Sequence, residues 1–176
     1  MTRTARPTFF KDAMPSAKVQ RAMRKAARDN HEDAEKAKVR RRDKGCRFPH
    51  CGCRKLRLRL EVSHSEHKGA GGNPKGDRSE AGKMVQVCAE RHKDNPISID
   101  KGSLRWVPMV AKLGANGPIA WQIDIALVNY YRGLRHDRPV EPRWMTLAEE
   151  TAPGGPLHPT TASQWDVLMW LADMRH

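Results

Sequence analysis

The sequence is poor in aromatic side chains and in long apolar segments. Aromatic residues make up 6% of its 176 residues, and no run approaches the ~18 apolar residues that a membrane-spanning helix needs. Residues 1–17 are polar and interrupted by Pro7 and Pro15, so they lack the apolar centre of a signal peptide. We therefore expect a cytoplasmic protein with no membrane partner. Its length predicts one modest domain with extensions, or two very small domains.

Acidic residues are scarce in the first half of the chain. Residues 1–45 carry 14 Lys and Arg against 6 Asp and Glu, residues 46–92 carry 10 against 5, and residues 93–176 carry 9 against 9. The net charge of +13 therefore lies in the first two segments. Such an excess attracts phosphate backbones and favours nucleic acid as the partner. An anionic membrane would require aromatic and leucine side chains on one helix face, and a basic solubilising tail stays open as an alternative.

Cysteine is also infrequent, but three of the four cysteines fall within eight residues. They are Cys46, Cys51 and Cys53, and the fourth is Cys88. In a reducing compartment this clustering favours a metal site over disulfides. The alternative is a set of ordinary buried cysteines.

Local patterns predict the elements of the basic half. Residues 16–44 contain neither Gly nor Pro and predict a mostly solvated basic helix with Ser16 as its N-cap. Apolar residues alternate with charged, mostly basic residues over 55–62, which predicts a half-buried strand that ends at Ser63 and His64. Met84–Val87 predicts a second strand that leads into a short helix from Cys88, ended before Pro96.

The neutral half predicts a hairpin and two helices. Residues 103–110 and 118–124 predict a β-hairpin with Trp106 and Trp121 facing a core. Residues 126–134 predict a helix, and the five prolines within 139–159 predict mostly loop. Residues 163–175 predict an amphipathic helix capped by Ser163. Its expected apolar stripe consists of Trp165, Leu168, Met169 and Ala172.

One stretch carries a family resemblance. A strand ends in Glu61-Val-Ser-His64, the glycine pair Gly71-Gly72 follows, and Cys88 and His92 close the pattern. This order resembles the zinc-supported core of HNH-type nucleases over residues 46–92, about a quarter of the chain. Such proteins often come from phages or mobile elements. The resemblance implies an α+β protein in three parts: a basic helical arm (1–45), a zinc-stapled ββα-metal core (46–95) and a hairpin-and-helix region (96–176) that scaffolds the core or contacts a protein partner.

The resemblance also implies roles for individual residues. His64 takes the place of the general base that activates water, and His92 takes the place of a ligand to one catalytic Mg²⁺ or Mn²⁺ ion. The activity expected is hydrolysis of phosphodiester bonds, with double-stranded DNA as the partner. Phosphate at the site would be held by Lys68, Arg78 and Arg91. Nucleic acid would be bound by Arg40, Arg41, Arg42, Arg57, Arg59 and Lys68.

Three positions depart from the family pattern. Ser63 stands where Asp or His usually ligates the metal, so one ligand is either missing or supplied by Glu66, His67 or Asp77. Lys83 stands where Asn usually precedes the second strand. Structural zinc requires four ligands; Cys46, Cys51 and Cys88 match three places, but Arg91 occupies the fourth. Cys53 is the best substitute, with His50 and His92 as rivals.

Two alternatives to an active nuclease follow from these departures. Ser63 and Lys83 favour a catalytically degenerate module that keeps the zinc fold and binds nucleic acid without cutting it. The second alternative is a structural component of a nucleoprotein assembly, in which the basic arm contacts phosphates and the neutral half docks on protein.

Overall fold

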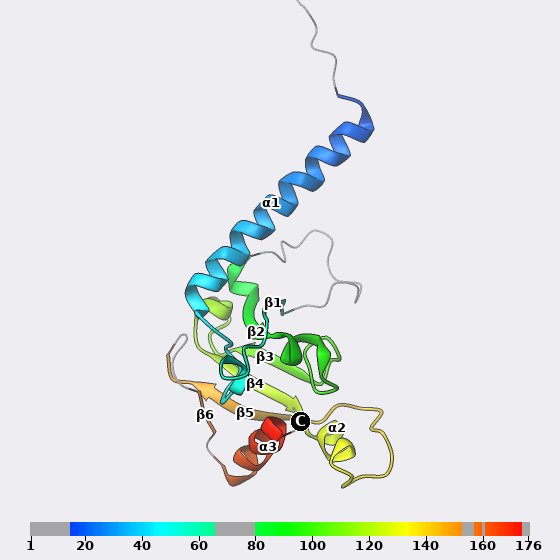
Figure 1. Cartoon of the computed structure of the whole chain (residues 1–176), viewed down its shortest axis with the longest axis vertical. Coiled ribbons are helices and arrows are strands. Elements are labelled where there is room, and N and C mark those ends of the chain that lie inside the picture. The colour runs from blue at the N-terminus through cyan, green and yellow to red at the C-terminus, as the bar shows by residue number, and fades with distance from the viewer. Residues whose placement is uncertain (1–14, 66–79, 153–156, 160, 174–176) are drawn as a thin grey trace, which may run out of the picture.

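The protein has a mixed α+β fold with helices and two small antiparallel sheets, which confirms the predicted class (Figure 1). The computed structural model describes residues 15–65, 80–152, 157–159 and 161–173. The helices are α1 (Ala17–Asp43), α2 (Ile125–Tyr131) and α3 (Ala162–Asp173). The strands are β1 (Leu60–His64), β2 (Met84–Cys88), β3 (Leu104–Pro108), β4 (Ile119–Asp124), β5 (Trp144–Glu150) and β6 (Leu157–His158).

Helix α1 is the predicted basic helix, and it extends away from the rest of the molecule (Figure 1). Ser16 caps it as expected, because its hydroxyl accepts a hydrogen bond from the Val19 amide at 3.4 Å. The helix ends at Asp43, and Lys44 adopts a left-handed conformation with φ of 52°. Only Glu35 and Val39 are buried, so the prediction of a mostly solvated helix is confirmed.

Strands β1 and β2 form a two-stranded antiparallel sheet in which Leu60 pairs with Cys88 and His64 pairs with Met84. The second strand is confirmed, but the first is shorter than predicted. Residues 55–59 form turns and irregular backbone, and Leu56 is 48% exposed. The predicted strand over 55–62 is therefore wrong at its start, because these residues complete the turn that carries Cys51 and Cys53.

The second sheet is an antiparallel meander of strands β3, β4, β5 and β6. Strands β3 and β4 form the predicted hairpin, and Trp106 and Trp121 pair across it with both side chains buried. The prediction of mostly loop over 139–159 is wrong, because β5 occupies the stretch between Pro142 and Pro153, where no proline interrupts the ladder.

The two later helices were placed correctly, with differences at the ends. Helix α2 is capped by the Asp124 carboxylate, which accepts from two amides of its first turn. Helix α3 is capped by Thr161 and not by Ser163: the Gln164 amide donates to the Thr161 hydroxyl, and the Thr161 amide donates to the Gln164 side chain. Its buried face consists of Val167, Leu168 and Leu171, whereas Trp165 and Met169 of the predicted stripe are 43% and 55% exposed.

A single hydrophobic core joins the two sheets. It contains Val85 and Val87 of β2, Trp121 of β4 and Leu171 of α3, and Phe48 of the cysteine loop packs into it. The cysteine-bearing segment is therefore built onto the larger sheet. Within the part of the chain that the structure describes, no helix is both long and apolar enough to cross a membrane.

Candidate metal centre

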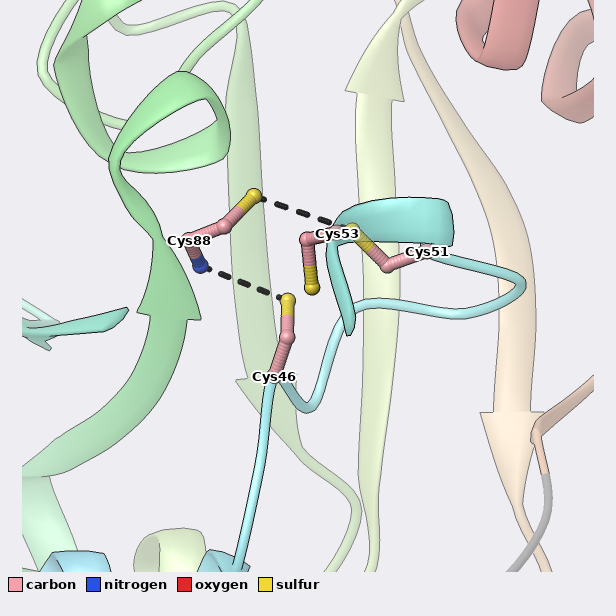
Figure 2. Close-up of side chains that lie close together, drawn as sticks. All are labelled: Cys46, Cys51, Cys53 and Cys88. Carbon is pink, nitrogen blue, oxygen red and sulfur yellow. Dashed lines mark hydrogen bonds between the residues drawn. The ribbon is translucent and has the colours of Figure 1, made fainter. Parts of the chain in front are cut away.

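The four cysteines converge on one point (Figure 2). Cys46 lies on the loop after α1, Cys51 precedes a tight turn, Cys53 lies within that turn, and Cys88 ends β2. Their sulfur atoms all lie within 4.8 Å of one another. Among the described residues, this is the one group of three or more Cys, His, Asp or Glu side chains arranged to hold a metal ion.

Backbone hydrogen bonds fix the turn that presents two of these sulfurs. The turn is η1 (Gly52–Arg54), and the Leu56 amide donates to the Gly52 carbonyl at 3.2 Å. The Leu58 amide donates to the Cys53 carbonyl at 2.9 Å, so the chain folds back before β1 begins. The Cys88 amide donates to the Cys46 sulfur at 3.4 Å, which ties the loop to β2. Backbone hydrogen bonds within residues 52–58 therefore hold the turn that carries Cys53.

The four thiols shift one another's pKa values because they lie in contact and are partly buried. Hydrogen bonds of the Cys46 thiol with Cys51, Cys53 and Cys88, together with burial, raise the pKa of Cys46. The hydrogen bond with Cys46 lowers the pKa of Cys53 against the opposing effect of burial. Thiolates packed this closely repel one another, so a bound cation is required before all four can ionise together.

The geometry fits zinc. A tetrahedral Zn²⁺ ion with Zn–S bonds of ~2.3 Å holds its sulfurs roughly 3.8 Å apart, and the Cys51 and Cys88 sulfurs lie 3.6 Å apart. That separation is far longer than the ~2.05 Å of a disulfide. Neither rival ligand belongs to the cluster. The His50 ring lies against Trp165 with centroids 4.7 Å apart, and His92 has carboxylate partners. Cys53 therefore completes the set.

A buried ion pair anchors the cysteine loop to the second sheet. The Arg47 guanidinium donates to both carboxylate oxygens of Glu150, at 2.7 and 2.6 Å. It also donates to the carbonyls of Ala115 and Gly117. The Trp121 indole donates to the Arg47 carbonyl at 3.0 Å. These bonds satisfy a charge that would otherwise be costly to bury, and they fix the loop between Cys46 and Cys51.

His92 belongs to η3 (Glu90–Asp94), a single π-helical turn after β2. Its ring lies between the carboxylates of Glu61 and Asp100. Its Nδ1 is 2.7 Å from Glu61 Oε2, and its Nε2 is 3.4 Å from Asp100 Oδ1. Asp100 is held there because its amide donates to the His92 carbonyl at 2.8 Å. The His92 and Lys93 hydrogen bonds lower the pKa of Glu61, although burial alone would raise it. Glu61 is therefore a carboxylate that can orient the imidazole.

His64 has a different neighbour. Its Nε2 lies 3.7 Å from Glu32 Oε1 of α1, and Lys36 binds the same oxygen at 2.7 Å. Glu61 and His64 are three residues apart on β1, so their side chains leave opposite faces of the strand. His64 and His92 thus have different carboxylate partners: Glu32 lies near His64, whereas Glu61 and Asp100 lie near His92.

The departures from the family pattern have clear places in the structure. Ser63 is 1% exposed and its hydroxyl donates to the His64 carbonyl at 3.4 Å. Lys83 pairs with Glu80. Arg91 is fully buried, donates to the Leu171 carbonyl at 2.6 Å and lies over the Phe48 ring. The expectation that Arg91 holds a phosphate is therefore wrong, because its guanidinium caps the end of α3.

The predicted nucleic-acid-binding residues divide into two groups. Arg40, Arg41 and Arg57 are exposed, and Arg59 is largely exposed and paired with Glu61. Arg42 is committed to the fold: it donates to the carbonyls of Ala81 and Met84 and to the Asn116 and Asp43 side chains. Seven residues singled out in the sequence lie outside the described residues: Glu66, His67, Lys68, Gly71, Gly72, Asp77 and Arg78.

Comparisons with known proteins found no match: no family model, no curated protein and no solved structure resembles this chain closely enough to be reported. What the fold and the site define is a mixed α+β protein with a four-cysteine cluster suited to zinc.

Sequence patterns missed the residues that hold these groups in place. Each of three contacts joins residues that are well separated in the sequence. Glu32 lies 32 positions from His64, Asp100 lies 8 positions from His92, and Glu150 lies 103 positions from Arg47. No short motif links such pairs. The one available signal was Glu61, because it belongs to the same Glu-Val-Ser-His run as His64.

Proposed function

We propose that this protein is a zinc-stapled, metal-dependent endonuclease of the HNH type that hydrolyses DNA phosphodiester bonds. One observation carries the proposal: the four sulfurs converge at the end of an antiparallel hairpin whose first strand ends in His64 and whose second leads directly into His92. This is the order of strand, strand and short helix that the ββα-metal core of that family requires.

The zinc in this proposal is structural. Cys46, Cys51, Cys53 and Cys88 would hold it and leave no position open for substrate. Its contribution is to hold the cysteine loop against β2, since the β1–β2 hairpin is a two-stranded sheet that is marginal by itself. The reaction then depends on the histidines outside this cluster.

The second metal would be a divalent cation held by His92 and Asp100. The 3.4 Å between His92 Nε2 and Asp100 Oδ1 is close to the spacing of two ligands that share one ion at about 2.1 Å each. Glu61 would accept a hydrogen bond from the Nδ1–H group of His92, and Nε2 would then be the nitrogen that ligates the ion, as in metal sites where a carboxylate supports the histidine. Asp100 would thus supply the ligand that Ser63 cannot. A cation there stabilises the charge that grows on the leaving oxygen.

His64 is the proposed general base. Its imidazole would take the proton of the attacking water, and the Glu32 carboxylate 3.7 Å away would stabilise the imidazolium that results. Exposed arginines before the cluster and on its turn, Arg40, Arg41 and Arg57, would contribute to phosphate binding.

Cleavage of supercoiled plasmid by the zinc-loaded protein with added Mg²⁺ or Mn²⁺ tests the activity. We expect His64→Ala to lower the rate by roughly 10²–10⁴-fold. Asp100→Asn should raise the concentration of Mn²⁺ needed for cleavage without releasing the structural zinc. His136→Ala, a change to an exposed histidine outside the proposed site, should cleave like the wild type. No cleavage with either metal would overturn the nuclease, as would equal cleavage by His64→Ala.

A second candidate is a zinc-containing module that binds nucleic acid without cutting it. The specific observations in its favour are the burial of Ser63 and the placement of Glu61 and His64 on opposite faces of β1. Together they separate the candidate base from the candidate cation site. Tight DNA binding with no cleavage under either metal, and no effect of His64→Ala on affinity, would favour this candidate.

A further inference from the structure

The N-terminal half of α1 is a solvent-exposed rod. Every described residue from Ala17 to Asn30 is exposed except Gln20, which is half-buried. In Figure 1 this part of the helix extends beyond the two sheets. The other half of α1 contacts the body through Glu32, which lies near His64, and through Glu35, Val39 and Arg42.

The charge on this rod has one sign as far as Arg28, and the acidic Asp29 follows. Residues 17–28 carry five basic side chains and no acidic one: Lys18, Arg21, Arg24, Lys25 and Arg28. At about 100° per residue these five positions fall within an arc of about 120°. The opposite side of the same segment carries Val19, Met23 and Ala26. We call the five basic residues the cationic face.

The cationic face lies on the same side of α1 as the residues that pack against the β1–β2 hairpin. At the same 100° per residue, Glu32, Glu35, Val39 and Arg42 fall within the same arc of about 120° as the cationic face. These four are among the residues through which α1 contacts β1, β2 and the turn before β2, and Asp43, which accepts from the Gln86 amide of β2, falls within the same arc. The cationic face therefore continues the body-facing side of α1 outward and overhangs the side of the molecule where Glu32 meets His64.

We propose that the cationic face of α1 binds the phosphate backbone of double-stranded DNA beside His64. The inference rests on the proposed function and specifies its substrate as a duplex. A rigid α-helix fits the major groove, which is about 12 Å wide, and five cations on one side can meet phosphates along it. Residues 17–28 contain no aromatic side chain, whereas proteins that hold single strands stack bases on aromatic rings.

Binding measurements with two matched variants test the proposal. Fluorescence anisotropy of a labelled duplex is followed over a range of salt, with zinc-loaded protein and no added Mg²⁺ or Mn²⁺. The first variant carries Arg21→Ala, Arg24→Ala and Arg28→Ala. The second adds Val19→Arg, Met23→Arg and Ala26→Arg, which restores the net charge but places it on the opposite side of the helix. Far-UV circular dichroism verifies that both variants keep α1 helical.

We expect the first variant to bind at least about tenfold more weakly, with a salt slope smaller by roughly 2.7, or about 0.9 for each lost cation. The second variant should remain weak despite its unchanged net charge. Wild-type affinity in either variant overturns the interface. Tighter binding of the wild type to a labelled single strand than to the duplex also overturns it. So does a result in which the two variants lose binding to anionic vesicles but keep the wild-type affinity for duplex.

The outcomes for cutting and binding can be told apart. A wild-type protein that binds duplex through this face but cleaves no plasmid supports the interface and overturns only the nuclease. A protein that cleaves plasmid, and whose two variants bind duplex as tightly as the wild type, overturns only the interface.

Discussion

Arg47 is the residue on which the position of the cysteine loop depends most. Its side chain is 3% exposed and binds a fully buried Glu150 carboxylate through two hydrogen bonds. We expect Arg47→Met to lower the free energy of unfolding by about 3–5 kcal/mol, because it leaves the Glu150 charge buried and uncompensated. Urea denaturation of the zinc-loaded protein measures the change.

The double variant Arg47→Met with Glu150→Met is the control for that prediction. Removing both charges replaces the ion pair with apolar side chains, which is often nearly neutral or stabilising. The double variant should therefore be more stable than Arg47→Met alone. If the double variant were less stable than Arg47→Met, the uncompensated charge would not be the cause.

Single substitutions also separate the zinc ligands from their rivals. We expect one zinc ion per chain in the wild type, because four sulfurs converge on one point and no His, Asp or Glu joins them among the described residues. Cys53→Ser should lower zinc affinity by at least about tenfold, since it removes one of four ligands. His50→Ala and His92→Ala should keep one zinc. Metal analysis and competition with a chelating dye measure these values, and loss of zinc in either histidine variant would contradict the four-sulfur site.

Residue identity predicted this cluster better than it predicted the groups around it. The spacing of Cys46, Cys51 and Cys53 was enough to indicate a metal site, because three thiols lie within eight residues. Arg47 looked like one more basic residue in a basic segment. Its burial depends on Glu150, 103 residues away, and sequence spacing carries no information about such a contact.

At the scale of elements, the turn η1 outweighs the alternating pattern that follows it. Apolar and charged residues alternate over 55–62, yet only Leu60, Glu61 and Val62 of these residues belong to β1. The amides of Leu56 and Leu58 bond back to the turn, so they are not available to a strand ladder. The turn that positions Cys51 and Cys53 therefore fixes the backbone conformation up to residue 59. The alternating pattern coincides with a strand only from Leu60 onward.

Strand β5 shows the opposite error. Five prolines within residues 139–159 indicated a loop, but none of them falls within Trp144–Glu150. Each proline acts on its own position and its immediate neighbours. The number of prolines over a long window therefore gave the wrong prediction for Trp144–Glu150. The helices were predictable because their capping residues and apolar periodicity are local signals.

The contact between η2 (Ala81–Lys83) and η4 (Gly114–Asn116) gives a prediction about a single glycine. Gly114 has φ of 54°, and a Cβ placed there would lie 2.3 Å from the Gly82 carbonyl oxygen. Gly102 has φ of 72° but nothing within 4 Å of such a Cβ. We expect Gly102→Ala to cost about 1 kcal/mol for its backbone conformation alone.

Gly114→Ala should cost clearly more than Gly102→Ala, by roughly a further 1–3 kcal/mol, because it also forces η2 and η4 apart. Both changes are measured by urea denaturation with zinc bound. Equal costs for the two variants would show that the close approach of Gly82 and Gly114 contributes nothing to stability.

At the scale of the whole molecule, the cysteine loop and the larger sheet share one core. Phe48 lies edge-on to Trp121 with ring centroids 5.2 Å apart. Arg91, on the helical turn after β2, is buried between Phe48 and the end of α3. Residues of β2 and residues of β3, β4, β5 and α3 therefore cover one another, and removing either group exposes apolar surface on the other.

This shared core leads to a prediction about fragments. Residues 46–95 contain all four cysteines, both strands of the hairpin and His92, and they correspond to the core expected from the resemblance. A peptide of these residues should bind zinc through the cysteines but should not acquire fixed tertiary structure. It would expose Phe48, Val85 and Val87, and it would leave Arg47 and Arg91 without Glu150 and the Leu171 carbonyl.

The measurement compares this peptide with the full chain, both loaded with zinc. Dispersed amide resonances and near-ultraviolet circular dichroism should be present for the full chain and absent for the peptide. Adding chelator to the full chain should release the cysteine loop and change the emission of Trp121, since the Arg47 carbonyl accepts the hydrogen bond of its indole. A peptide that folded by itself with zinc would instead mean that the sulfur cluster is sufficient for stability. The buried contacts to the second sheet would then be a docking surface between two independent units.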